Sequence, residues 1–153
     1  MLLWINIRIS MTNPRYQRGL VDTSVIIALE FLNPEDLPVE FAVSAITLAE
    51  LAAGPHATSN TEEKARRQDR LQRIEALVEA LPVDTPVARA YGRIYNAVAA
   101  LGRKPRGRRA FDLLIAATAL AENLPLFTAN PDDFAGLDSL IRVISVDLPH
   151  PSE

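Results

Sequence analysis

Four acidic residues that lie far apart in the sequence share one local context. Each stands next to the end of a predicted strand or the start of a predicted helix: Asp22, Glu50, Asp112 and Asp133. In an open parallel sheet, ligands bind in the crevice at the carboxyl ends of the strands. Asp22, Glu50 and Asp133 are therefore expected at that edge, and Asp112 joins them if its helix starts there too. Carboxylate oxygens suit Mg²⁺ or Mn²⁺ rather than zinc, so the pattern predicts a divalent-metal site.

Helix capping is the competing explanation for the same acids. Acidic residues in a first helical turn stabilise the helix dipole and accept from free N–H groups. Thr47 and Glu50 have the spacing of a capping box, and Asn130 and Asp133 resemble one. Asp22 is explained less well in this way, because the two hydroxyl residues that follow it can cap their helix themselves. We prefer the metal interpretation, because unpaired carboxylates at one edge repel each other unless a cation lies among them.

A short basic segment precedes Asp112. Five of the sixteen Lys and Arg residues lie in the segment 103–109. Positive charge at the rim of an acidic pocket steers a polyanion toward it, and the guanidinium group binds phosphate with planar, bidentate geometry. A solvated charged loop is the alternative. We expect these arginines to contact the phosphates of a nucleic acid: Arg103, Arg106, Arg108 and Arg109.

Alternating strands and helices must position these residues. Strands are expected at 19–21, 41–46, 125–128 and 141–146. Helices are expected at 25–29, 47–53, 61–80, 85–101 and 111–122, with a short helical turn at 130–134. Such alternation implies parallel βα units with right-handed crossovers. The predicted fold is a three-layer α/β domain, with a central, mostly parallel sheet of four to five strands flanked by helices.

Composition restricts the chemistry further. The chain has 153 residues, no cysteine, two histidines and a formal net charge of −3. The length fits one domain. Without cysteine there is neither a disulfide framework nor a thiolate metal site, and two histidines argue against a zinc site built on imidazoles. No apolar run reaches the ~18 residues that span a bilayer, so a cytoplasmic protein without a membrane segment is expected.

The segments around the four acids resemble the successive motifs of PIN-domain nucleases, in particular VapC toxins. The segments 20–27, 44–51, 111–119 and 127–134 carry the resemblance, in the family's order and at its spacing. The resemblance implies a PIN domain at 19–148, preceded by an N-terminal extension at 1–18. Most family members begin a few residues before the first aspartate, so Met11 is an alternative start of the protein.

The resemblance also implies a function. VapC toxins are metal-dependent endoribonucleases that hydrolyse tRNA or rRNA with Mg²⁺ or Mn²⁺, form homodimers and are inhibited by a VapB-type antitoxin. The family's acidic site falls on the residues Asp22, Glu50, Asp112 and Asp133, with Asp132 as the other candidate for the fourth position. The polar helpers of the family fall on the residues Thr23, Ser24, Thr128 and Asn130. Two short apolar helices, at 25–31 and 48–53, are the expected docking surface for the antitoxin.

The sequence motifs are compatible with other functions. A PIN nuclease of RNA processing, or a catalytically silent PIN scaffold that binds partners, would share the motifs. A phosphotransfer domain with an acidic Mg²⁺ pocket needs Asp-x-Asp after the first strand or a lysine on a later strand. Here Thr23 and Ser24 follow Asp22, and no lysine lies near a predicted strand end. These departures argue against the phosphotransfer hypothesis, and the four intact acids argue against a silent scaffold.

Overall fold

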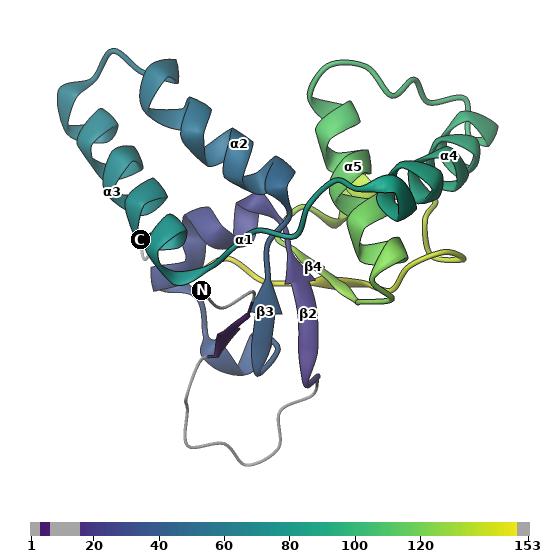
Figure 1. The fold of residues 1–153 in the computed structure, drawn as a ribbon, viewed down its shortest axis with the longest axis horizontal. Helices are drawn as coiled ribbons and strands as arrows, with labels where there is room; N and C mark the ends of the chain where they lie inside the picture. The colour runs from purple at the N-terminus through teal and green to yellow at the C-terminus, as the bar shows by residue number, and fades with distance from the viewer. Residues whose placement is uncertain (1–3, 7–15, 150–153) are drawn as a thin grey trace.

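A five-stranded sheet forms the centre of the protein, as seen in a computed structural model that describes residues 4–6 and 16–149 (Figure 1). Its strands are β1 (Ile5–Asn6), β2 (Arg18–Val21), β3 (Glu40–Ala42), β4 (Leu126–Thr128) and β5 (Val143–Ser145). The order across the sheet is β1-β3-β2-β4-β5, with β1 antiparallel to β3 and the other neighbours parallel. The predicted α/β fold with a mostly parallel sheet is confirmed.

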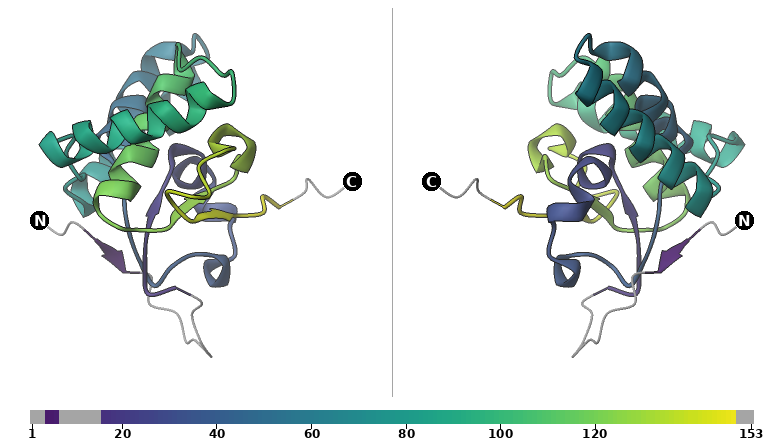
Figure 2. Two further views of the ribbon diagram at one scale, coloured as in Figure 1. Left: turned by 90° about the vertical axis from the view of Figure 1, so that its right-hand side faces the viewer. Right: turned by 90° about the vertical axis from the view of Figure 1, so that its left-hand side faces the viewer.

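Five helices cover the two faces of this sheet, and each of the two side views faces one group of them (Figure 2). They are α1 (Thr23–Ala28), α2 (Ala45–Ala53), α3 (Thr61–Leu77), α4 (Thr85–Ala100) and α5 (Arg108–Ala121). The 3₁₀ turns η1 (Leu29–Phe31) and η3 (Gly54–Ala57) directly follow α1 and α2, and η4 (Pro131–Phe134) follows β4. The packing arises from the alternation of strand side chains. Leu20 and Leu126 pack with α4 and α5, whereas Val21 and Phe127 pack with α1 and α3.

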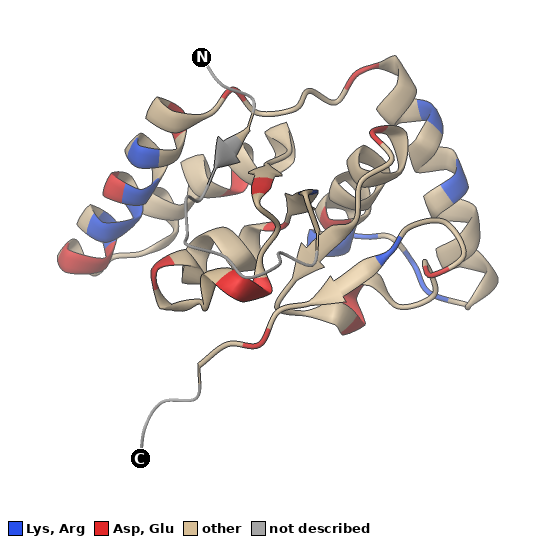
Figure 3. Ribbon diagram, turned by 90° about the horizontal axis from the view of Figure 1, so that it is seen from below, with Lys and Arg blue, Asp and Glu red and all other residues tan. Residues whose placement is uncertain are grey.

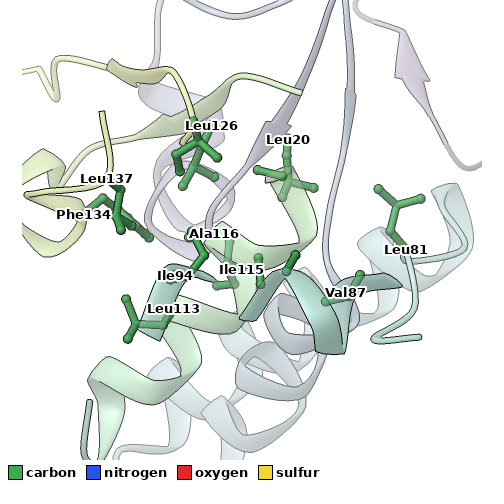
Figure 4. Packing of buried hydrophobic residues seen from close by; sticks show 14 of the residues in the cluster. Leu20, Leu81, Val87, Ile94, Leu113, Ile115, Ala116, Leu126, Phe134 and Leu137 are labelled. Carbon is green, nitrogen blue, oxygen red and sulfur yellow. The ribbon is translucent and has the colours of Figure 1, made fainter. Parts of the chain in front are cut away.

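The layer between the sheet and the α4–α5 pair is a continuous apolar core (Figure 4). Leu20 and Leu126 from the strands meet Ile94 of α4 and Ile115 of α5, and all four side chains are buried. Phe134 of η4 joins the same core. This packing fixes α5 and η4, which carry Asp112 and Asp133, relative to the central strands.

Gly19 allows β2 to approach β4 closely. A Cβ atom at this position would lie 2.5 Å from Cε2 of Phe127, which is a clash with a fully buried ring. A larger residue would therefore push apart the two strands that lead into Asp22 and Thr128. The glycine contributes to the site through this spacing rather than through its own chemistry.

The surface helices α3 and α4 differ in charge. Acidic and basic residues alternate along α3, whereas the charged residues of α4 are arginines (Figure 3). On α3, Glu63 pairs with Arg66 at 2.7 Å and with Arg67 at 2.9 Å, the latter pair being expected from its i,i+4 spacing. Hydrogen bonds from these two arginines lower the pKa of Glu63. The charge of α3 is thus largely balanced within the helix.

Three helix starts differ from the sequence-based expectation. Helix α2 begins at Ala45 with Ser44 as its N-cap, so Thr47 lies inside the helix and the capping-box explanation for Glu50 is wrong. Asp22 itself caps α1, so the expectation that the following hydroxyl residues do so is also wrong. Helix α5 begins at Arg108, which places Asp112 in the second turn rather than the first.

The N-terminal segment adds an edge strand to the sheet. Ile5 and Asn6 pair with β3, and the guanidinium carbon of Arg18 lies 4.7 Å from the ring centroid of Trp4. Arg18 also forms an ion pair with Glu40 at 2.8 Å. Met11 lies outside the described residues. Among the helices that the structure describes, none is both long and apolar enough to cross a membrane.

Candidate active site

Asp22 is a buried carboxylate at the junction of β2 and α1. Its backbone N–H donates to the carbonyl of Phe127 at 3.0 Å, which extends the pairing of β2 with β4. Its side chain accepts from the N–H of Val25, from the hydroxyl of Ser24 and, at 2.6 Å, from the hydroxyl of Thr128. Burial raises the pKa of Asp22, and these hydrogen bonds oppose the rise. The carboxylate is therefore held in one orientation at the carboxyl end of the central strand.

Glu50 is joined to the same region through α2. Thr23 Oγ1 donates a hydrogen bond to Glu50 Oε1 at 2.7 Å and lies 3.1 Å from Thr47 Oγ1. Thr47 and Glu50 stand three residues apart on one helix face, which explains why both reach Thr23. The role of Thr47 was missed in the sequence, because its spacing to Glu50 also fits a capping box. These contacts connect the start of α1 to α2 beside the site.

Asp112 and Asp133 line a surface pocket of about 610 Å³ between α5 and η4. Burial is the main cause that raises the pKa of Asp112 to about 6, and the negative charges of Asp133, Glu50 and Asp22 contribute the rest of the rise. The charge of Arg108 opposes it. The four acids thus lie close enough for each of the other three to disfavour ionisation of Asp112.

The fourth acid can be distinguished from its neighbour. The charge of Asp133 acts on Asp112, whereas Asp132 also lines the pocket but offers its backbone carbonyl to Arg103 Nη1 at 3.4 Å. This arrangement favours Asp133 over Asp132 as the functional acid. The capping alternative for Asp133 loses support, because the side chain of Asn130 makes no capping hydrogen bond at the start of η4.

The polar residues named from the sequence support the acids in different ways. Ser24 accepts from the N–H of Ala129 at 3.0 Å while its hydroxyl contacts Asp22. Thr128 is fully buried and accepts from the N–H of Asn130 at 3.0 Å while its hydroxyl donates to Asp22. Asn130 takes part through its backbone and lines the pocket of Asp112. The backbone between β4 and η4 is therefore hydrogen-bonded to the two hydroxyl groups that donate to Asp22.

The basic segment is only partly a loop. Arg108 and Arg109 form the first turn of α5 and line the acidic pocket, and Arg103 reaches η4 from the preceding loop. Arg106 is exposed and does not line that pocket. None of these four arginines forms an ion pair with another residue of the described chain. Two of them, Arg108 and Arg109, therefore lie at the acidic pocket without an ion-pair partner in the described chain.

The donor chemistry of the site fits a hard divalent cation. The side chains of Asp22, Glu50, Asp112 and Asp133 offer carboxylate oxygens, and their mutual repulsion is what a bound cation relieves. As the side chains stand, no three Asp, Glu or His residues of the described segments converge closely enough to hold one ion. Two of the carboxylates are instead turned to hydroxyl groups, Asp22 to Thr128 and Glu50 to Thr23.

Comparison with known proteins identifies the family. The PIN domain profile matches residues 19–140. Ribonuclease VapC5 of Mycobacterium tuberculosis is 40% identical over 128 residues, which are 82% of this chain and 91% of that protein. The structure of VapBC-5, a member of the VapBC family of toxin–antitoxin systems from the same organism, matches with a TM-score of 0.73 at 38% identity, over 86% of this chain and 99% of the other. FitAcB of Neisseria gonorrhoeae matches with a TM-score of 0.63 at 31% identity, over 82% and 96% of the two chains. The chain therefore belongs to the PIN-domain family, within its VapC group.

Proposed function

We propose that this protein is the toxin of a toxin–antitoxin pair and acts as a Mg²⁺- or Mn²⁺-dependent endoribonuclease. The observation that carries the proposal is the electrostatic coupling of Asp112 to Asp22, Glu50 and Asp133 at one edge of the sheet. The relatives are named ribonucleases, and a similar solved structure belongs to a toxin–antitoxin family. The acids and the relatives thus support the same reaction, hydrolysis of an RNA phosphodiester bond.

The side chains divide the work of this reaction. Asp22 and Asp112 would hold the cation, which would lower the pKa of a bound water and offset charge on the phosphoryl oxygens. Thr128 and Ser24 keep Asp22 in its orientation. Glu50, held by Thr23, and Asp133 would bind the cation through water or orient the attacking water. Arg108 and Arg109 at the pocket are placed to bind the phosphate groups.

The proposed partner is an antitoxin of the VapB type. Exposed apolar side chains on α1 and η1 support the expected docking surface, because Ile27 is 44% and Phe31 65% exposed. Ala49 and Ala53 of α2 line the adjacent pocket together with Ile27. A second copy of the chain is the other proposed partner. Intact acids at all four positions favour a nuclease over a silent scaffold, and the choice between a toxin and an RNA-processing nuclease rests on the partner.

Metal removal tests the reaction. Purified protein incubated with a mixture of tRNA and rRNA is expected to cleave it in Mg²⁺ or Mn²⁺ and to stop when EDTA is added. The products are expected to carry a 5′-phosphate and a 3′-hydroxyl, to be measured by end-labelling. Cleavage that continues in EDTA would overturn the metal-dependent mechanism. Growth arrest on expression, relieved by a small protein encoded next to this gene, tests the toxin assignment separately.

Two neighbouring substitutions test the fourth acid. We expect Asp133→Asn to lower kcat/KM for RNA cleavage by about 10- to 100-fold, because this carboxylate acts on Asp112. Asp132→Asn is the matched control and is expected to change the rate by less than about threefold, since its side chain is not among the charges that act on Asp112. A larger loss in Asp132→Asn than in Asp133→Asn would reverse the assignment.

A further inference from the structure

A second pocket opens beside the acids and has a different character. It has a volume of about 660 Å³ and lies among α1, α2, α3 and the start of α5. Thr23 and Glu50 of the candidate active site form part of its wall. Apolar side chains, including Ile27 and Phe111, form another part. The pocket next to the acids is therefore lined partly by apolar side chains, and it is large enough to hold a flat ring system.

Phe111 is one of two exposed phenylalanines among the described residues, the other being Phe31. Phe41, Phe127 and Phe134 are at most 1% exposed, whereas Phe111 is 48% exposed. It directly precedes Asp112 on α5, and its ring lines the second pocket. An exposed aromatic ring stacks well on a nucleobase, and such stacking is a main source of affinity in complexes with single-stranded nucleic acid. The ring therefore provides a stacking surface one residue away from an acid of the site.

Arginine side chains line the same pocket as this stacking surface. Arg108 lines both the acidic pocket and the second pocket, and Arg70 of α3 lines the second pocket. Arg67 of the same wall is already bonded to Glu63 and to the carbonyl of Gly54, each at 2.9 Å. Within the described chain, Arg70 and Arg108 form no ion pair. These two guanidinium groups are thus available to phosphates on either side of a base.

We propose that the second pocket binds the base of the nucleotide next to the scissile phosphate, stacked on Phe111, while Arg108 and Arg70 contact the flanking phosphates. This proposal rests on the ribonuclease function proposed above. Continuity with the acidic pocket argues that RNA occupies this pocket when the antitoxin is absent, because Arg108 lines both pockets and Glu50 of the candidate active site forms part of the wall of this one. A base enters such a pocket only when it is unpaired, so the substrate class is RNA with an unstacked nucleotide at the cleavage position.

Binding measurements without cleavage test the proposal. Fluorescence anisotropy with a short labelled single-stranded RNA, in EDTA, compares wild type with variants at Phe111. We expect Phe111→Ala and Phe111→Leu to weaken binding by about 5- to 100-fold, and Phe111→Trp to keep it within about threefold. Tyr95→Ala removes an aromatic ring with 47% exposure on α4, outside the pocket, and is the matched control with an effect below about twofold.

An abasic scan identifies the stacked base. Single abasic sites are introduced along the RNA. At one position, the abasic site is expected to lower the affinity of wild type by the same factor as Phe111→Ala lowers the affinity for intact RNA. At that position the abasic site should not lower the affinity of the Phe111→Ala variant further, as in a double-mutant cycle. A duplex of the same sequence should bind all Phe111 variants equally.

Several outcomes would overturn the base-binding proposal. These are unchanged single-strand binding in Phe111→Ala, equal losses on the duplex, losses that add at every abasic position, or a changed oligomeric state in sedimentation. Unchanged RNA binding in Phe111→Ala together with weakened binding of a co-expressed antitoxin would assign the pocket to the antitoxin alone. Because binding is measured in EDTA, a failure of metal-dependent cleavage contradicts the ribonuclease function and leaves this test separate.

Discussion

Replacing Asp22 with asparagine is expected to lower kcat/KM for RNA cleavage by about 1,000-fold or more, while the protein keeps its fold. The loss is expected because the carboxylate would hold the cation, whose contribution to such reactions is several kcal/mol. The fold is expected to survive because asparagine is as good an N-cap as aspartate and can still accept from the N–H of Val25. Removing a buried charge whose pKa is raised also favours the folded state.

A second variant at the same position separates catalysis from capping. Asp22→Ala is expected to be as inactive as Asp22→Asn, but to lose about 1 kcal/mol of unfolding free energy relative to it, because alanine cannot cap α1. Activity is measured by single-turnover cleavage and stability by denaturant unfolding. Appreciable cleavage by Asp22→Asn would remove Asp22 from the mechanism. Equal stability of the two variants would remove its capping role.

Asp112 is expected to make the metal-free protein less stable as the pH rises. Its pKa is about 6 in the folded state against an ordinary value of 3.8, so the folded state binds the proton more tightly than the unfolded state does. Its contribution to stability is therefore fully present below pH ~4 and is lost as the pH rises through ~6. The rise in the pKa from 3.8 to about 6 corresponds to about 3 kcal/mol of unfolding free energy, and solvent screening of this half-buried group reduces that to about 1–2 kcal/mol. We expect Asp112→Asn to raise the unfolding free energy by that amount at pH 7 and by almost nothing at pH 4.

Unfolding in EDTA between pH 4 and pH 8 measures this effect. The Asp112→Asn variant should keep part of the fall in unfolding free energy that wild type shows with rising pH, because the pKa of Asp22 is raised as well. Asp138→Asn, an exposed aspartate outside both pockets, is the matched control and should follow wild type. Added Mg²⁺ should stabilise wild type at pH 7 more than it stabilises Asp112→Asn. If Asp112→Asn instead destabilises the metal-free protein at pH 7, the four acids do not repel each other as described.

The regular elements of the fold could be predicted because local periodicity determines them. The strand expected at 19–21 is observed as Arg18–Val21, and the helix expected at 85–101 is observed as Thr85–Ala100. The start of α2 could not be predicted in the same way, because Ser44 and Thr47 are both good caps. Leu81 pairs with this segment: it donates to the carbonyl of Val43 and accepts from the N–H of Ala45, so Ser44 stays extended and the helix begins directly after it. A contact across about forty residues leaves no local signal.

The acids of the site could be named from their spacing, but their surroundings could not. Arginine is a good helix former, so Arg108 can begin α5 once Gly107 adopts a φ of +60°. The start of α5 could not be recognised in the sequence, because it lies inside a run of basic residues that is typical of an exposed loop. Phe111 looks like an ordinary apolar residue of a helix, and only tertiary packing turns its ring outward beside Asp112. The identities of the reactive groups are therefore local information, whereas their exposure and contacts are not.

The double role of Asp22, as helix cap and as part of the site, has an evolutionary consequence. A single change to asparagine would end catalysis yet keep the hydrogen bond that starts α1. Because the clustered acids oppose folding when no cation is bound, such inactive descendants would also be more stable. In a population without selection for cleavage, the requirements of folding would therefore not oppose this substitution.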